Sequence, residues 1–161
     1  MSVAVPYTSW RSSPGYGFGV TLPVGYEEAV RLARVALGRE GFGIVSEIDL
    51  ARTLYEKLAV EIPPYLLLGV CNPALAREAL EADPDIGLLL PCSVAIRGAA
   101  VPGRAHMLAL DPVAALGLTG RSDLARLAGD VRARLERAIA RTAEDALATV
   151  QQRGAEDAEI C

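Results

Sequence analysis

Two apolar runs of this chain end at a cysteine, and the first carries the most specific chemical signal in the sequence. Residues 66–71 read Leu-Leu-Leu-Gly-Val-Cys, and residues 87–92 read Gly-Leu-Leu-Leu-Pro-Cys. Cys71 is followed by Asn72, a favoured helix N-cap, and by Pro73, a favoured first helical residue. The pattern predicts that Cys71 lies beside a helix N-terminus, where the positive end of the backbone dipole lowers the pKa of a thiol.

Two interpretations of Cys71 remain open from the sequence. A thiol activated by the helix N-terminus would act as a nucleophile or a redox group, which makes Cys71 the candidate catalytic residue. A cysteine at the end of an apolar strand is also a common small hydrophobic residue of a core, without any chemistry. Cys92 follows three leucines, so we assign it to the core, and we expect the terminal Cys161 to be inert.

Charged residues that precede this stretch form a second candidate cluster. Residues 42–49 alternate like a strand, which places Glu47 and Asp49 on one face, and Lys57 follows far enough along the chain to return and pair with them. One interpretation is a cluster that orients a ligand. The other is a solvent-exposed face with a surface ion pair. The predicted ligand-binding residues are Asn72, Pro73, Glu47, Asp49 and Lys57.

The sequence favours neither a metal site nor a cofactor site. Cys71, Cys92 and the lone His106 are acceptable zinc or copper ligands by type, but they lack the close Cys-x-x-Cys spacing that identifies such sites. The glycines between Gly15 and Gly19 fall inside an alternating strand pattern, so they do not form a dinucleotide-binding fingerprint. Neither a Gly-Lys-Ser/Thr phosphate loop nor a hydrolase nucleophile motif occurs. We therefore predict no metal and no cofactor.

Composition and charge narrow the class of protein. The 161 residues are 52% hydrophobic and 22% charged, which favours one folded globular unit over disorder. The net charge of −4 argues against nucleic acid, which requires clustered Lys and Arg. No apolar run approaches the roughly 18 residues of a membrane helix, and the N-terminus does not resemble a signal peptide. We expect a cytoplasmic protein that contacts neither membrane nor nucleic acid.

Hydrophobic periodicity predicts a mixed α/β fold. Apolar residues that alternate or run continuously indicate five strands, at about 15–22, 42–49, 65–71, 86–97 and 104–110. Apolar stripes and capping residues indicate helices at about 26–40, 50–58, 73–82, 112–118 and 122–153. The predicted parts of the chain are a flexible N-terminal arm (1–14), one α/β domain (15–140), and a helical extension with an acidic tail (141–161).

The last predicted helix is longer than the rest of the domain requires. About thirty residues at 1.5 Å each span about 45 Å, more than the sheet of a domain of this size covers. We therefore expect the far half of this helix to contact something other than the sheet. A third interpretation is accordingly that the protein is a structural subunit of an assembly.

Four short motifs occur in a characteristic order within residues 15–135. They are Tyr16-Gly17-Phe18, Glu47-Ile48-Asp49, Cys71-Asn72-Pro73 and Leu88-Leu89-Leu90-Pro91-Cys92. This order resembles domain-of-unknown-function family 302. The resemblance implies an α+β sandwich with helices on a mainly antiparallel five-stranded sheet of TATA-box-binding-protein-like topology. It also implies a tendency to dimerise and no established activity. The residues beyond Arg141 look like an extension to the family pattern.

Strand direction determines where the two internal cysteines lie. If residues 65–71 pair antiparallel with residues 86–97, Cys71 faces the start of the second strand. Cys92 then lies several residues away, at about 3.4 Å per residue, so we expect the two thiols to be apart.

Our leading hypothesis is a small-molecule-binding α/β module that acts as a homodimer. The ligand would lie in the sheet or in a dimer cleft near Cys71, Asn72 and Glu47. The alternative is a thiol-dependent enzyme or redox protein that uses Cys71 at the helix N-terminus.

Overall fold

The computed structural model describes residues 15–160, so the predicted arm (1–14) and Cys161 lie outside the described residues. The five strands are β1 (Gly17–Leu22), β2 (Gly43–Asp49), β3 (Tyr65–Cys71), β4 (Cys92–Gly98) and β5 (Ala105–Leu110). The helices are α1 (Tyr26–Arg39), α2 (Leu50–Leu58), α3 (Pro73–Ala82), α4 (Pro112–Gly117) and α5 (Ala125–Glu159). Two short 3₁₀ segments are η1 (Pro84–Leu89) and η2 (Ser122–Leu124).

The strands form one five-stranded sheet in the order β1-β5-β4-β3-β2, and every neighbouring pair is antiparallel. The first strand in the chain pairs with the last, so β1 forms one edge of the sheet and β2 the other. The predicted fold class is confirmed: helices pack on an antiparallel five-stranded sheet, and a long helix ends the chain.

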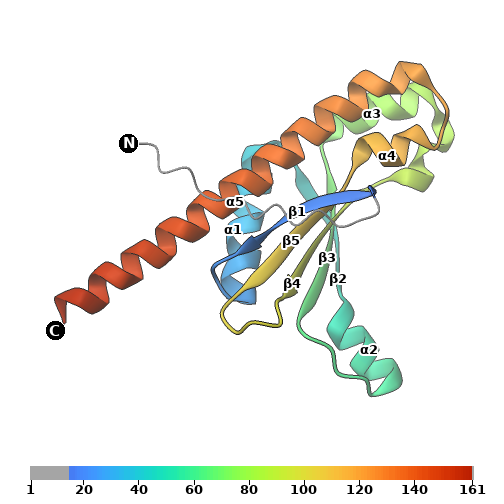
Figure 1. The fold of residues 1–161 in the computed structure, drawn as a ribbon. Coiled ribbons are helices and arrows are strands. Elements are labelled where there is room, and N and C mark those ends of the chain that lie inside the picture. Colours follow the sequence, from blue (N-terminus) through green and yellow to red (C-terminus); the bar gives the residue numbers. More distant parts are fainter. Residues whose placement is uncertain (1–14, 161) are drawn as a thin grey trace.

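One face of the sheet is buried under α1 and α5 (Figure 1). Alternate side chains point into this layer, such as Leu66, Leu68 and Val70 on β3, while Ile96 of β4 and Met107 of β5 are fully buried in it. Within residues 15–160, no helix packs over the middle of the opposite face. The helix α2 projects from the far end of the β2–β3 hairpin, and none of its residues is buried.

A second, smaller apolar cluster lies beyond one end of the sheet. It is enclosed by α3, η1, α4, η2 and the first turns of α5, and Ile86 and Leu124 are almost completely buried in it. We call these elements the cap. Because α5 contributes side chains to both clusters, it joins the cap to the sheet.

The helix α5 extends well past the sheet. It is 35 residues long, which corresponds to about 52 Å, and it continues to Glu159, beyond its predicted end at 153. Its last buried residue is Ala146, Leu147 and Thr149 are partly buried, and residues 150–159 are exposed and project from the body of the protein. Neither α5 nor any other helix within residues 15–160 combines the length and apolar character needed to cross a bilayer.

The predicted start of the fourth strand is wrong. Residues 84–89 form η1, where the Asp83 carboxylate accepts a hydrogen bond of 3.0 Å from the backbone N–H of Asp85 and starts a helical turn. The run Leu88-Leu89-Leu90 is apolar, but a short apolar run does not distinguish a strand from a helical turn. The strand β4 therefore begins at Cys92.

The packing of α5 predicts that substitutions in its packed part and in its projecting part have very different effects on stability. Leu135 is fully buried, so Leu135→Ala is expected to lower the free energy of unfolding by about 3 kcal/mol, through lost apolar contact and the cavity left behind. Val150 lies on the projecting half, and Val150→Ala is the matched control, with an expected change below about 0.5 kcal/mol. Urea denaturation followed by circular dichroism measures both values, and equal losses would contradict this packing.

Candidate functional site

An apolar cavity of about 40 Å³ lies where the end of the sheet meets the cap. The adjoining ends of β3 and β4, together with α3, α4 and α5, contribute to its wall. Most of the lining side chains are aliphatic, among them Val70, Leu75, Leu90, Leu116 and Val131. Among the lining residues, only Asn72, Cys71 and Cys92 carry a polar or sulfur-containing side chain. The wall is therefore mainly hydrophobic, with its polar groups gathered at the end of β3.

Asn72 is held at the cavity wall as the N-cap of α3. Its side-chain Oδ1 accepts a hydrogen bond of 3.2 Å from the backbone N–H of Leu75, and Pro73 occupies the first helical position. Cys71 is the last residue of β3, so it directly precedes the N-terminus of α3 and lines the cavity. The predicted position of Cys71 beside a helix N-terminus is confirmed.

The turn after α1 approaches Asn72 closely. Gly41 has a φ of +83°, a left-handed conformation that only glycine adopts without strain. A Cβ atom at Gly41 would also lie 2.9 Å from Nδ2 of Asn72. Beside this turn, Arg134 donates a hydrogen bond of 3.2 Å to the Glu40 carbonyl, and Arg137 pairs with the Glu40 carboxylate at 3.0 Å. These contacts let α5 hold the end of α1 against Asn72.

The two internal cysteines lie close together, which corrects the prediction that they are apart. The strands β3 and β4 are antiparallel as predicted, but β4 starts at Cys92, and the cross-strand partner of Cys92 is Val70. Cys92 is therefore next to the residue that precedes Cys71, and both cysteines line the cavity. Burial raises the pKa of Cys92 to about 11, and the charge of Cys71 adds to the shift. Cys92 is thus held as a neutral thiol packed against the core, in agreement with its predicted assignment.

Hydrogen bonds of Asp111 hold together the part of the cavity wall that β5 and α4 form. One carboxylate oxygen accepts a hydrogen bond of 2.9 Å from the backbone N–H of Val113 and caps α4, and the other accepts one of 2.5 Å from Arg132 of α5. The backbone N–H of Asp111 donates to the carbonyl of Tyr16 at 2.8 Å. The Arg132 guanidinium also lies 5.3 Å from the centre of the Phe18 ring. One residue thereby links β1, β5, α4 and α5.

The predicted cluster of Glu47, Asp49 and Lys57 lies away from the cavity. Asp49 is at the far end of β2, where its carboxylate caps α2 by accepting a hydrogen bond of 2.9 Å from the backbone N–H of Arg52. Glu47 forms an ion pair with Arg34 of α1. Lys57 lies exposed in the last turn of α2, and within residues 15–160 no ion pair joins it to either carboxylate. The fold therefore does not bring these three charges to Asn72.

His106 lies towards the same far end of the sheet. It pairs across strands with Arg97, and its Nδ1 is 2.9 Å from the hydroxyl oxygen of Thr21. Burial lowers the pKa of His106, and the charge of Arg97 lowers it further. In the part of the chain that the structure describes, no three metal-ligating side chains come together. His106 is thus separated along the strands from Cys71 at the end of β3 and Cys92 at the start of β4.

Sequence reasoning missed most of the cavity wall. Leu110, Leu116, Leu127 and Val131 come from β5, α4 and α5, which are distant in sequence from Asn72. Their apolar spacing predicts that they are buried, but it does not predict what they face. Asp111 directly before Pro112 fits the pattern of a helix cap, but its bond to Arg132, 21 residues later, has no local signature.

Comparisons with known proteins agree with this fold. Residues 18–142 match the family described as Domain of unknown function DUF302. A solved structure, described as the crystal structure of uncharacterized conserved protein DUF302 from Bacillus stearothermophilus, is similar with a TM-score of 0.73 and 25% identity. The similarity covers 80% of this chain and 98% of that chain. No curated protein matches. The chain belongs to the DUF302 family, and the family match ends within α5.

The raised pKa of Cys92 predicts how stability depends on pH. A cysteine in the unfolded chain ionises near the ordinary value of 9.0, whereas the pKa of folded Cys92 is about 11. Between these values the unfolded state releases a proton that the folded state retains, so stability is expected to fall as pH rises. Thermal unfolding at about pH 8 and about pH 10.5 measures the loss, which is expected to be smaller in Cys92→Ala than in wild type. An equal loss in both proteins would contradict the raised pKa.

Proposed function

We propose that this member of the DUF302 family is a small-molecule-binding α/β module that acts as a homodimer, with its ligand in the cavity beside Cys71 and Asn72. The observation that carries the proposal is the lining of the cavity, which is aliphatic except for one amide and two sulfur-containing side chains. Ligand sites commonly combine an apolar wall with a few polar groups that fix the orientation of the ligand.

The size of the cavity limits the ligand. At about 40 Å³ it is much smaller than a cavity of roughly 150 Å³ that holds benzene inside a protein core. A ligand of more than a few atoms therefore requires the cap to move outwards. The outer side of α3 is tied to α5 by an exposed ion pair between Glu78 and Arg126, and exposed pairs contribute little stability. We expect a small, mainly apolar ligand that displaces α3 when it binds.

Asn72 gives the site a polar end. Because its Oδ1 accepts the capping hydrogen bond from Leu75, the donor that Asn72 offers to a ligand is the amide nitrogen Nδ2. A ligand with a carbonyl or hydroxyl oxygen matches this donor. Pro73 supports the turn that presents the amide. The acidic cluster on β2 is not part of the proposal, since its carboxylates cap α2 and pair with α1.

Thiol chemistry at Cys71 is the second candidate function. The observation that favours it is the position of this cysteine, which lines the cavity and directly precedes the N-terminus of α3. A helix N-terminus stabilises a thiolate. Cys92 is unsuited to the same role, since burial raises its pKa to about 11. Under this alternative Cys71 is the nucleophile, and Asn72 orients the substrate.

Binding to the cavity can be tested with small molecules of the expected type. We expect 2-butanone, which is apolar with one carbonyl acceptor, to shift the amide NMR signals of Cys71, Asn72 and Leu75 in a saturable way. Ala76→Leu places a larger side chain in the cavity wall and is expected to weaken binding at least tenfold. The matched control is Ala148→Leu on the exposed part of α5, which should bind like wild type.

Two results would overturn this proposal. One is the absence of saturable shifts with 2-butanone and with benzene, which is a second apolar probe without an acceptor. The other is unchanged binding by a folded Ala76→Leu variant, because the ligand would then lie outside the cavity.

The thiol alternative predicts selective labelling of Cys71. Iodoacetamide reacts with the thiolate, and a lower pKa raises the thiolate fraction while reducing its nucleophilicity, so an activated Cys71 is expected to be alkylated at pH 7 about threefold faster than a model thiol of about pKa 8.5. Mass spectrometry of peptides gives the rates for Cys71 and Cys92 in one sample. Asn72→Ala removes the cap of α3 and is expected to slow the reaction at Cys71. A Cys71 that reacts no faster than the model thiol rules out activation.

A further inference from the structure

A groove of about 250 Å³ lies on the face of the sheet opposite α1 and α5, and we call it the sheet groove. It follows the central strand β4, where Ser93 and Ala95 carry small side chains. The larger Leu108 and Leu110 of the neighbouring strand β5 line the groove beside them. The hollow therefore arises because small residues on one strand adjoin leucines on the next.

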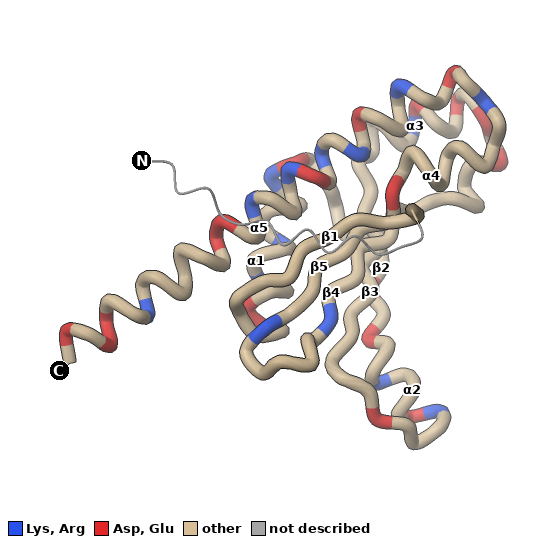
Figure 2. Tube along the Cα trace, viewed as in Figure 1, with Lys and Arg blue, Asp and Glu red and all other residues tan. Residues whose placement is uncertain are grey.

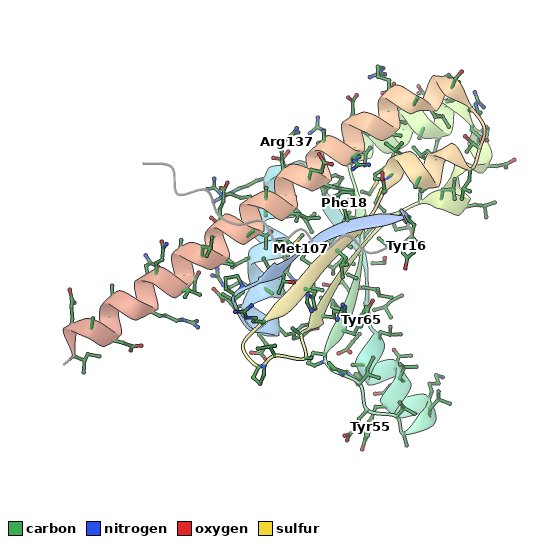
Figure 3. All side chains as sticks on the ribbon, viewed as in Figure 1. Tyr16, Phe18, Tyr55, Tyr65, Met107 and Arg137 are labelled. Atoms are coloured by element: carbon green, nitrogen blue, oxygen red, sulfur yellow. The ribbon has the colours of Figure 1, made fainter. Side chains whose placement is uncertain are left out.

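The two ends of the sheet groove carry aromatic side chains. Tyr16, the residue before β1, lines the end nearer the cap, and Tyr65, the first residue of β3, lines the end nearer α2. In Figure 3, Met107 lies between the sheet and α5, whereas Tyr65 lies on the other side. Figure 2 shows that charged residues gather mainly on the helices and that the strands carry few. Among the residues that line the groove, only Arg97 is charged, so its surface is mainly apolar and aromatic.

The sheet groove is accessible to a binding segment. Tyr16 is 58% exposed, Ser93 is exposed, and Ala95, Leu108 and Leu110 are partly exposed. Antiparallel sheets with one solvated face normally carry polar residues on it, so an apolar hollow there is typical of a contact surface. At about 250 Å³ the groove is larger than a cavity of roughly 150 Å³ that holds benzene, and it therefore has room for an aromatic side chain.

Residues 1–14 of the same chain match the sheet groove in chemistry. They include Tyr7 and Trp10, and Trp10 is the only tryptophan in the sequence. Arg11 is the only charged side chain among them, and two valines add apolar surface. Aromatic side chains gain more from burial than smaller apolar side chains do, since each ring removes a large area from water. The family match starts at residue 18, so this aromatic segment lies outside the family pattern.

We propose that residues 1–14 bind in the sheet groove of their own chain, with the Trp10 ring over Ala95. The segment ends two residues before Tyr16, which is itself part of the groove. Trp10 precedes Tyr16 by six residues, a reach of up to about 20 Å. Ala95 lies two strands from β1, or about 10 Å across the sheet, and about two residues, or about 7 Å, along it. The ring therefore reaches Ala95 without stretching the chain.

The covalent connection favours this occupant over a separate molecule. A segment joined to its site by a short linker has an effective concentration in the millimolar range, so weak contacts are enough to keep it bound. The exposed hydroxyl of Ser93 offers an acceptor for the indole N–H of Trp10, which needs a hydrogen-bond partner when the ring is buried. The groove thus provides both an apolar floor and a polar contact for the ring.

Tryptophan fluorescence tests the proposal, because it reports Trp10 alone. We expect acrylamide to quench Trp10 about threefold less in the native protein than in a free peptide of residues 1–14, since the bound ring is shielded from solvent. Ala95→Glu places a charge on the apolar floor of the groove and is expected to raise quenching to the level of the peptide, with an unchanged circular dichroism spectrum. The matched control is Ala148→Glu on the exposed part of α5, which should be quenched like wild type.

NMR of the unsubstituted protein tests the contact directly and does not depend on the folding of Ala95→Glu. We expect nuclear Overhauser effects between the ring protons of Trp10 and the methyl protons of Ala95 and Leu108. A mixture of isotope-labelled and unlabelled chains distinguishes contacts within one chain from contacts between two chains. The expected result is that the contacts occur within one chain.

Three results would overturn the inference. Equal quenching of Trp10 in the native protein and in the free peptide would show that residues 1–14 do not bind. Unchanged quenching in a folded Ala95→Glu would show that they bind elsewhere. Overhauser effects that occur only between different chains would assign the groove to a second copy. None of these results bears on the cavity beside Asn72, which the 2-butanone experiment tests.

Discussion

The contact between Asp111 and Arg132 holds the architecture together. Asp111 is one of two buried polar residues found within residues 15–160, and its carboxylate joins the cap of α4 to α5, while its backbone binds the start of β1. Partly buried ion pairs have a strong effect when one partner is lost, because the other charge is left unpaired. The contact therefore fixes α5 against the start of α4, next to Pro112 and Val131 of the cavity wall.

Local signals in the sequence predicted most of the fold. Asn72 caps α3 as its position before Pro73 predicts, and Asp49 and Asp111, which are favoured capping residues by type, cap α2 and α4. These signals depend on a few adjacent residues, so one sequence is enough to read them. The segment 84–89 was misread, because three leucines in a row have no period and leave strand and helix equally open. Because of this error, Cys92 was predicted to lie inside the fourth strand and away from Cys71, whereas it is the first residue of β4 and pairs with Val70 of β3.

The sequence predicted only those parts of the candidate site that are neighbours along the chain. Cys71 and Asn72 are sequence neighbours, so their relation to α3 followed from the capping pattern. Glu47 and Asp49 were expected nearby because they are chemically suitable, but strand geometry carries them to the other end of β2. Part of the aliphatic wall, such as Leu116, Leu127 and Val131, comes from the last third of the chain, and pattern analysis identifies such residues as buried without pairing them.

The path of α5 has a consequence for how the protein unfolds. Because one continuous helix contributes to the main core and to the cap, neither cluster can lose its packing without exposing part of the same helix. The two clusters therefore behave as one cooperative unit, and the amides in the middle of α5 exchange with solvent deuterium only when the whole chain opens. The exposed turns after Thr149 exchange by fraying, so hydrogen exchange along this one helix shows where the packed part of the protein ends.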